Sequence, residues 1–119
     1  MLYLAFHGSP GKLNLPSGTL TLEDLAEKMK TGFGGWVVHL GTCATIKVPT
    51  QRLDNFLEAT NVAMVIGYEQ NVKWLESAST ELLLLDHLQR YVDMNRMWTA
   101  FSKKYAGLVR LTGMAARSL

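Results

Sequence analysis

The sequence contains a single cysteine among its 119 residues, so it cannot form an internal disulfide. This fits a reducing compartment, and we expect a cytoplasmic protein. No apolar run approaches the roughly 20 residues that a membrane-spanning helix needs. No positively charged segment precedes the short apolar N-terminus, which argues against a signal peptide. We therefore expect no contact with a membrane.

Charge is also scarce, because charged residues make up 18% of the chain and the formal net charge is only +2. So small an excess does not by itself indicate a nucleic-acid partner. Half of the basic residues follow residue 89, where Asp93 is the only acid. We interpret that segment as a solvated helical face and predict no binding to nucleic acid, because it lacks the interleaved aromatic residues of a base-stacking surface.

Sequence patterns for metals and bound cofactors are missing as well. His39 and Cys43 do not have a spacing typical of zinc sites, and no further pair of ligands accompanies them. The segment from Gly8 to Lys12 lacks both the spacer and the hydroxyl residue of a phosphate-binding loop. We predict neither a metal nor a cofactor.

Two short apolar runs are the strongest features that the sequence does have. Residues 2–6 lead into His7-Gly8, and residues 36–40 lead into Gly41-Thr42-Cys43. Unbroken apolar runs of this length are typical of strands buried on both faces of a parallel sheet. A third run, residues 62–66, ends at Gly67 and is followed by Tyr68 and Glu69.

Helices are predicted between these strands. Thr21 and Asp24 have capping-box spacing ahead of apolar residues at helical intervals, and Pro49-Thr50 begins a second helix. The glycines and prolines between His7 and Gly18 predict a loop. Alternating strands and helices predict an α/β fold, with a short parallel sheet between helical layers in a three-layer sandwich.

The C-terminal part is predicted to be helical over about residues 72–106, within a single domain of residues 1–119. A long helix over about 72–92 carries an apolar stripe, and further leucines widen that stripe; its members are Leu75, Ala78, Leu82, Leu85 and Val92. A second helix spans about 94–105. The tail from Gly107 has no pattern that predicts its structure. We expect the long helix either to lie between layers or to form a subunit contact.

His7 and Cys43 are the candidate catalytic pair, because the carboxyl ends of parallel strands gather reactive groups at one edge of a sheet. A cysteine nucleophile needs a nearby imidazole and backbone donors for the oxyanion. Gly8 has no Cβ, so a substrate carbonyl can approach its N–H closely. Taken singly, each residue has a structural interpretation, since isolated cysteines are usually buried and isolated histidines usually hydrogen-bonded.

Three further residues are weaker candidates. Glu69 is the acid nearest this edge and is either a solvated loop residue or a selector of basic side chains. Ser9 is either a loop cap or a substrate contact. His39 lies inside a predicted buried strand, and we expect a structural role for it.

The order apolar strand, His-Gly, helical spacer, apolar strand, Cys resembles the signature of caspase-like cysteine peptidases. That clan also contains legumains, gingipains, separases and the bacterial CHAT domains. More narrowly, the sequence looks like an uncharacterised prokaryotic caspase-like family, through the segments YLAFHGSPGKL, LTLEDLAE, VVHLGTCAT and VIGYEQNVKWLESASTELLLLD. The motifs proper span residues 2–45, and a looser likeness extends to about Asp86.

The resemblance implies a peptidase that cleaves peptide or protein substrates without a cofactor. Cys43 is then the nucleophile, His7 its partner, and the N–H groups of Gly8 and Cys43 form the oxyanion hole. In that fold the histidine strand is normally the third of the sheet, whereas here it comes first. The resemblance therefore implies that the N-terminal strands are missing. Either the chain is a piece of a longer protein, or a second copy or a partner chain completes the sheet, or the fold is trimmed.

Two alternatives accompany this prediction. One is a catalytically silent caspase-like module that keeps the fold for assembly. The other is an esterase of the α/β-hydrolase type, because residues 6–11 resemble the oxyanion loop of those enzymes. However, the segment Gly41-Thr42-Cys43-Ala44-Thr45 lacks the second glycine of a nucleophile elbow.

Overall fold

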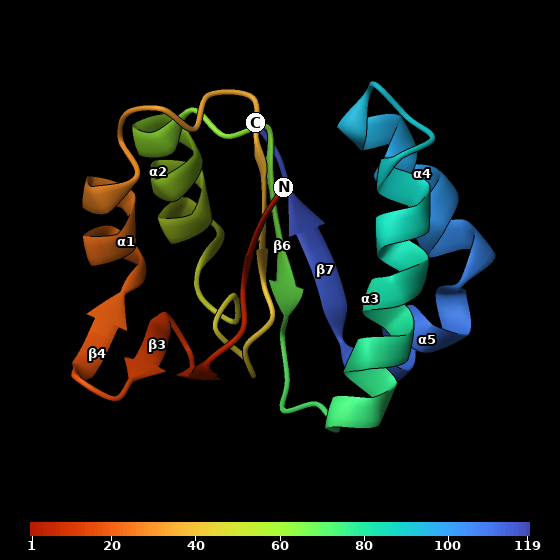
Figure 1. The fold of residues 1–119 in the computed structure, drawn as a ribbon, viewed down its shortest axis with the longest axis horizontal. Helices are drawn as coiled ribbons and strands as arrows, with labels where there is room; N and C mark the ends of the chain where they lie inside the picture. The colour runs from red at the N-terminus through yellow and green to blue at the C-terminus, as the bar shows by residue number, and fades with distance from the viewer.

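A four-stranded sheet runs through the middle of the protein, whose computed structural model describes all of residues 1–119 (Figure 1). The strand order is β1-β5-β6-β7, with bounds Leu2–Leu4, Val37–Leu40, Met64–Tyr68 and Met114–Arg117. β1, β5 and β6 are parallel, as predicted, and β7 is antiparallel to β6. The α/β class is confirmed. β1 is an edge strand, because only β5 pairs with it.

Helices cover both faces of this sheet and complete three layers (Figure 1). On one face lie α1 (Leu22–Lys28) and α2 (Thr50–Thr60). On the other lie α3 (Trp74–Leu88), α4 (Met94–Lys104) and α5 (Ala106–Thr112). None of these helices combines the length and the apolar character needed to cross a membrane.

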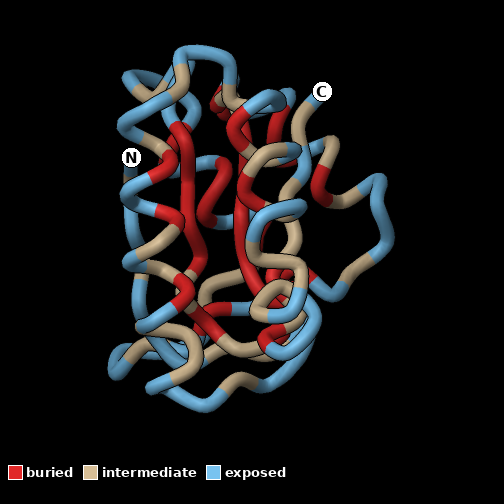
Figure 2. The backbone as a smooth tube through the Cα atoms, turned by 90° about the vertical axis from the view of Figure 1, so that its right-hand side faces the viewer, coloured by how far each residue is buried: buried red, intermediate tan, exposed pale blue.

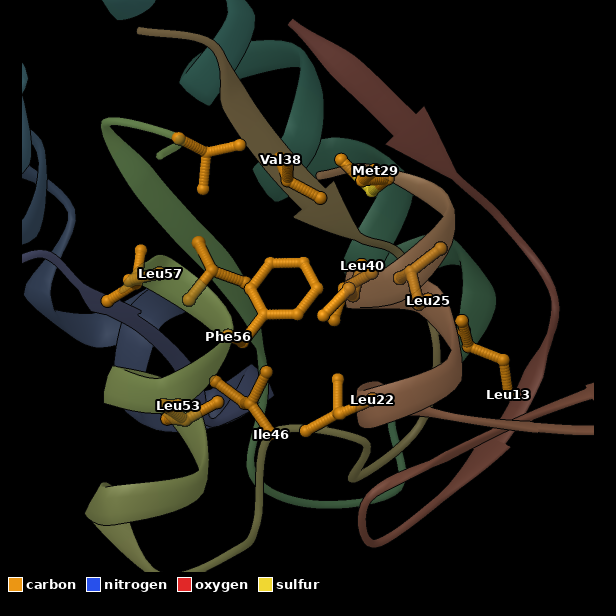
Figure 3. Close-up of a cluster of buried hydrophobic side chains, with 13 residues drawn as sticks. Leu13, Leu22, Leu25, Met29, Val38, Leu40, Ile46, Leu53, Phe56 and Leu57 are labelled. Atoms are coloured by element: carbon orange, nitrogen blue, oxygen red, sulfur yellow. The ribbon is translucent and has the colours of Figure 1, made fainter. Parts of the chain in front are cut away.

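Each face of the sheet has its own hydrophobic core, and the buried residues concentrate along the central strands (Figure 2). The core beneath α1 and α2 contains 13 buried residues, and the ring of Phe56 from α2 points toward Leu40 of β5 (Figure 3). The core beneath α3, α4 and α5 contains eight, among them Tyr68, Met97 and Phe101. Every residue of β5 and β6 is buried, as expected for central strands.

The prediction of a loop over residues 7–18 is wrong. Three short strands form an antiparallel sheet there: β2 (His7–Ser9), β3 (Lys12–Leu15) and β4 (Gly18–Thr21). The two-residue connection Pro10-Gly11 explains the error, because proline suits the first position of a tight turn and Gly11 takes a φ of 71° at the second. Glycine and proline here connect strands and do not mark a long loop.

The capping box predicted at the start of α1 is confirmed, since Thr21 and Asp24 exchange hydrogen bonds between side chain and backbone. The tail from Gly107 forms α5 and β7. Gly113, with a φ of 71°, ends α5 and turns the chain into β7. Arg117 at the end of β7 makes a two-pronged ion pair with Asp54 of α2.

The predicted apolar stripe is not the side of α3 that the structure buries. Leu75 and Leu82 are each 69% exposed, and Val92 lies beyond the helix and is fully exposed. The buried residues of α3 are Thr80, Leu84 and His87. Two of these are polar, and they find partners that a hydropathy pattern does not register. Thr80 donates to the carbonyl of Glu76, and the ring of His87 packs among aromatic residues of the helical layer.

Candidate active site

Cys43 lies in a tightly held turn at the carboxyl end of β5, which we call the Cys43 loop (residues 41–45). Thr42, Ala44 and Thr45 are buried, whereas Cys43 itself is half-buried. The Thr42 and Thr45 hydroxyls are 2.6 Å apart, and Thr45 donates to the carbonyl of Lys12. Ala44 has a left-handed φ of 56°, which non-glycine residues seldom adopt. The loop therefore holds the neighbours of Cys43 in place, and the thiol itself donates to the carbonyl of Val72 at 3.9 Å in a partly buried position.

The His7–Gly8 segment packs directly on this loop. A Cβ built on Gly8 would lie 2.3 Å from the Thr45 hydroxyl, 2.8 Å from the Thr42 Cβ and 2.9 Å from the Cys43 carbonyl oxygen. Only glycine permits so close an approach. The structure thus brings the two predicted segments together, from the ends of β1 and β5. His7 is exposed at the start of β2.

Backbone donors are available at both predicted oxyanion positions. The N–H of Cys43 donates no hydrogen bond within the protein. In the hairpin of β2 and β3, the pair Ser9–Lys12 flanks the two-residue turn and is of the hydrogen-bonded kind. Hydrogen-bonded and non-hydrogen-bonded pairs alternate along an antiparallel ladder. The next pair, Gly8–Leu13, is therefore of the non-hydrogen-bonded kind, and the Gly8 N–H faces away from β3.

A groove of about 520 Å³ opens beside His7, and we call it the His7 groove. It extends from the ends of β1 and β5 to the first turns of α3. Gly41 lines it, and Cys43, two residues further along the chain, lies just outside the lining. The lining residues important here are Tyr3, Phe6, His7, Gly41, Trp74 and Glu81. Gly41 packs on the Tyr3 side chain, because a Cβ there would lie 2.9 Å from its ring atom Cε2 and 2.9 Å from its hydroxyl oxygen.

A hydrogen-bonded cluster, the Glu81 network, lies at the inner end of this groove. The hydroxyl of Tyr3 donates to Glu81 Oε1 at 2.8 Å, and that of Tyr68 donates to Oε2 at 2.6 Å. His39 Nε2 is 2.8 Å from Oε2. The His39 ring stacks on Tyr3 and meets Tyr68 edge to face. The network therefore connects β1, β5 and β6 to α3.

Burial and hydrogen bonding set the protonation of this network. Burial by itself raises the pKa of Glu81, but hydrogen bonds from His39, Tyr68 and Tyr3 outweigh it and leave that pKa below its ordinary value. Burial, reinforced by Glu81, raises the pKa of Tyr3 to about 12 and raises that of Tyr68 further. Glu81 is thus an anion held by neutral phenol donors at neutral pH.

The remaining predicted residues lie around the site in different ways. His39 is buried in the Glu81 network, in keeping with the structural role expected of it, and its Nδ1 has no partner. Ser9 is half-buried in β2. Glu69 is exposed after β6, and its N–H donates to the carbonyl of Gly113; it does not line the His7 groove. No group of three histidine, cysteine or acidic side chains is arranged to hold a metal ion.

Sequence reasoning missed Glu81. The signal available was an acid at a position facing the sheet, three residues from both Ala78 and Leu84 on an otherwise leucine-rich helix. An acid on such a face requires a partner, and the tyrosines and histidine of three separate strands supply it.

The fold and site define an α/β protein with a cysteine and a histidine in adjoining segments at one edge of a largely parallel sheet. The chain belongs to the family of unknown function DUF6642, whose family model matches residues 1–115. No curated protein matches it.

Proposed function

We propose that this protein is a caspase-like cysteine endopeptidase in which Cys43 and His7 form the catalytic dyad. The observation that carries the proposal is the contact of Gly8 with the Cys43 loop, because the segment that bears the imidazole packs against the loop that bears the only thiol. The half-buried thiol, the rigid loop around it and the unused N–H of Cys43 support the same function. Because the nucleophile must stay reduced, the proposal includes a cytoplasmic location.

The chemistry is acyl transfer in two steps. His7 takes the thiol proton, and the Cys43 sulfur forms a bond to the peptide carbonyl carbon. The N–H groups of Gly8 and Cys43 stabilise the oxyanion. The carbon–nitrogen bond then breaks as His7 gives its proton to the leaving amine. Water, deprotonated by His7, attacks the thioester, and the acid product leaves as the thiol is restored.

The test is covalent labelling of Cys43 by peptide acyloxymethyl ketones, measured by intact mass. We expect labelling at Cys43 to slow by about a hundredfold in His7→Ala, because general acid–base catalysis contributes at least that much. His87→Ala is not a suitable control, because that ring is buried. The matched control is Asn14→Ala, which removes another side chain from the groove wall. Labelling that does not respond to His7→Ala would refute the dyad.

The α/β-hydrolase alternative receives no support from the Cys43 loop. A nucleophile elbow passes directly from strand to helix. Here a buried turn follows Cys43, and α2 begins only at Thr50.

The second candidate is an assembly module, and the unpaired edge of β1 favours it. The carbonyl of Leu4 accepts a hydrogen bond from the N–H of Gly41, so the backbone N–H and C=O of Leu4 point toward β5. Because these directions alternate along a strand, the backbone groups of Tyr3 point away from the sheet. Beside this edge is an apolar pocket of about 390 Å³ between β1 and α3, lined in part by Met1, Leu82 and Leu85. Such an edge is ready to pair with another strand.

The occupant we propose for this edge is a second copy of the chain. Two β1 strands that pair antiparallel about a twofold axis through Tyr3 satisfy both outward backbone groups of that residue. Light scattering on the purified chain should give a dimer, and Leu82→Glu should give a monomer because it places a charge in the apolar contact. Ser79→Glu, at another exposed position on the same helix, should leave the dimer intact. A monomeric wild-type chain would exclude this assembly.

A further inference from the structure

The His7 groove combines aromatic walls with one anionic group at its inner end. Tyr3, Phe6 and Trp74 are 46%, 43% and 75% exposed, so their rings are accessible along the groove. Glu81 is the only acid among the lining residues, and none of them is a lysine or arginine. A groove with this lining attracts a cation, and no lysine or arginine in its wall competes for the carboxylate.

The carboxylate of Glu81 retains the capacity to accept a further bond. Its Oε2 is hydrogen-bonded to both His39 and Tyr68, whereas its Oε1 accepts a hydrogen bond only from the Tyr3 hydroxyl. A carboxylate oxygen accepts two hydrogen bonds, so Oε1 has one acceptor position left. The side chain is 13% exposed, so a ligand group that reaches it is largely removed from water and its charge is weakly screened.

The position of Gly41 relates this carboxylate to the proposed nucleophile. Gly41 lies two residues before Cys43, a span of about 7 Å in extended chain. It packs on the Tyr3 ring, which in turn is hydrogen-bonded to Glu81 Oε1. A substrate whose carbonyl is at the Cys43 thiol can therefore extend its adjoining side chain past Gly41 toward Glu81, and a long side chain suits this path.

We propose that the His7 groove binds an arginine side chain on the amino side of the bond to be cleaved, with Glu81 accepting from its guanidinium. The inference rests on the proposed peptidase function and names its substrate class. Arginine fits better than lysine, because the planar guanidinium stacks on aromatic rings and keeps several donors for the carboxylate. Glu81 is thus a specificity residue, and the Glu81 network holds its carboxylate in place.

The experiment compares acyloxymethyl ketone peptides that differ only in the residue next to the reactive ketone: arginine, citrulline, leucine or aspartate. Citrulline has nearly the shape of arginine without its charge. On the full chain, we expect the arginine peptide to label Cys43 about tenfold or more faster than the citrulline peptide, because a bond between charged groups is the stronger one. Glu81→Gln should reduce this ratio to near one.

Glu69→Gln is the matched control, because it is the same substitution in the exposed acid outside the groove, and the arginine preference should persist. Equal labelling of the wild-type chain by the arginine and citrulline peptides, with labelling still dependent on His7, overturns the arginine site and leaves the peptidase standing. The comparison of the arginine and citrulline peptides does not use Glu81→Gln, so it holds even where that variant fails to fold. Absence of labelling by every peptide, or labelling indifferent to His7→Ala, overturns both proposals.

Discussion

Gly8 is the residue on which the candidate site most directly depends. Its missing side chain lets β2 rest on the Cys43 loop, and the atoms around it come from three different residues of that loop. Two of those residues, Thr42 and Thr45, are buried and hydrogen-bonded to each other. Rotation of one flexible side chain therefore cannot make room for a Cβ at position 8.

Gly8→Ala should lower the free energy of unfolding by about 1–3 kcal/mol, the usual cost of overpacking, and should slow labelling of Cys43. The Cβ would lie within 3 Å of Thr45, Thr42 and Cys43 atoms, so the two catalytic segments must separate. Urea unfolding and labelling rates measure the two effects. In Gly107→Ala the new Cβ meets nothing within 4 Å, and this variant should be unchanged or stabilised by about 0.5–1 kcal/mol.

At the scale of single elements, α3 is the helix whose orientation the sequence describes least well. Leucines occupy positions 75, 82, 83, 84, 85 and 88, so every side of the helix carries an apolar residue. The structure selects the side with Leu84, which is 1% exposed, and leaves Leu82 69% exposed. Two neighbouring leucines of one helix therefore differ greatly in what they contribute to stability.

Leu84→Ala should lower the free energy of unfolding by about 2–5 kcal/mol, because it leaves a cavity in the core beneath α3. In the monomeric chain, Leu82→Ala makes the same chemical change two residues away and should stay within about 0.5 kcal/mol of wild type. Urea unfolding of both variants, at one protein concentration, gives the comparison. Equal losses would mean that the stripe with Leu82 is buried in solution.

The elements that could be predicted are those with strong local signals. The apolar runs predicted β1 and β5, and Thr21 with Asp24 predicted the start of α1. The short strands β2, β3 and β4 carry too few residues for alternation to stand out, and their turn residues dominate the pattern. The sequence indicates no partner for β7, because its antiparallel pairing with β6 depends on contacts between distant segments.

The same limit applies to the candidate site. His7 and Cys43 each follow an apolar strand, so the edge that they share could be predicted from parallel topology. The Glu81 network could not, because its four residues come from four elements and only the assembled sheet brings them together. The acid that is near the site along the sequence, Glu69, lies outside the groove, and the acid inside the groove is remote in sequence.

At the scale of the whole molecule, the Glu81 network joins the sheet to the layer formed by α3, α4 and α5, because Glu81 lies on α3. One buried carboxylate holds donors from β1, β5 and β6, so its charge state affects contacts across the sheet. The pKa of Glu81 lies below its ordinary value of 4.5 in the folded protein, because its hydrogen bonds outweigh its burial. Ionised Glu81 therefore contributes stability above that ordinary value, and the contribution is lost as the pH falls through the lower, folded-state pKa.

Tyr68→Phe removes the shortest bond to this carboxylate and should lower the free energy of unfolding by about 1.5–3 kcal/mol near neutral pH, the range for hydrogen bonds to charged groups. The difference from wild type should shrink toward about 1 kcal/mol once Glu81 is protonated in the folded state, because the bond then joins two neutral groups. Urea unfolding of both proteins at neutral pH and at successively lower pH measures this change. Tyr91→Phe, at a hydroxyl without a protein partner, should show a small difference that is independent of pH. A Tyr68→Phe loss of only about 1 kcal/mol at neutral pH that stays constant at lower pH would mean that Glu81 is already protonated at neutral pH, and that the groove lacks the anion needed to select arginine.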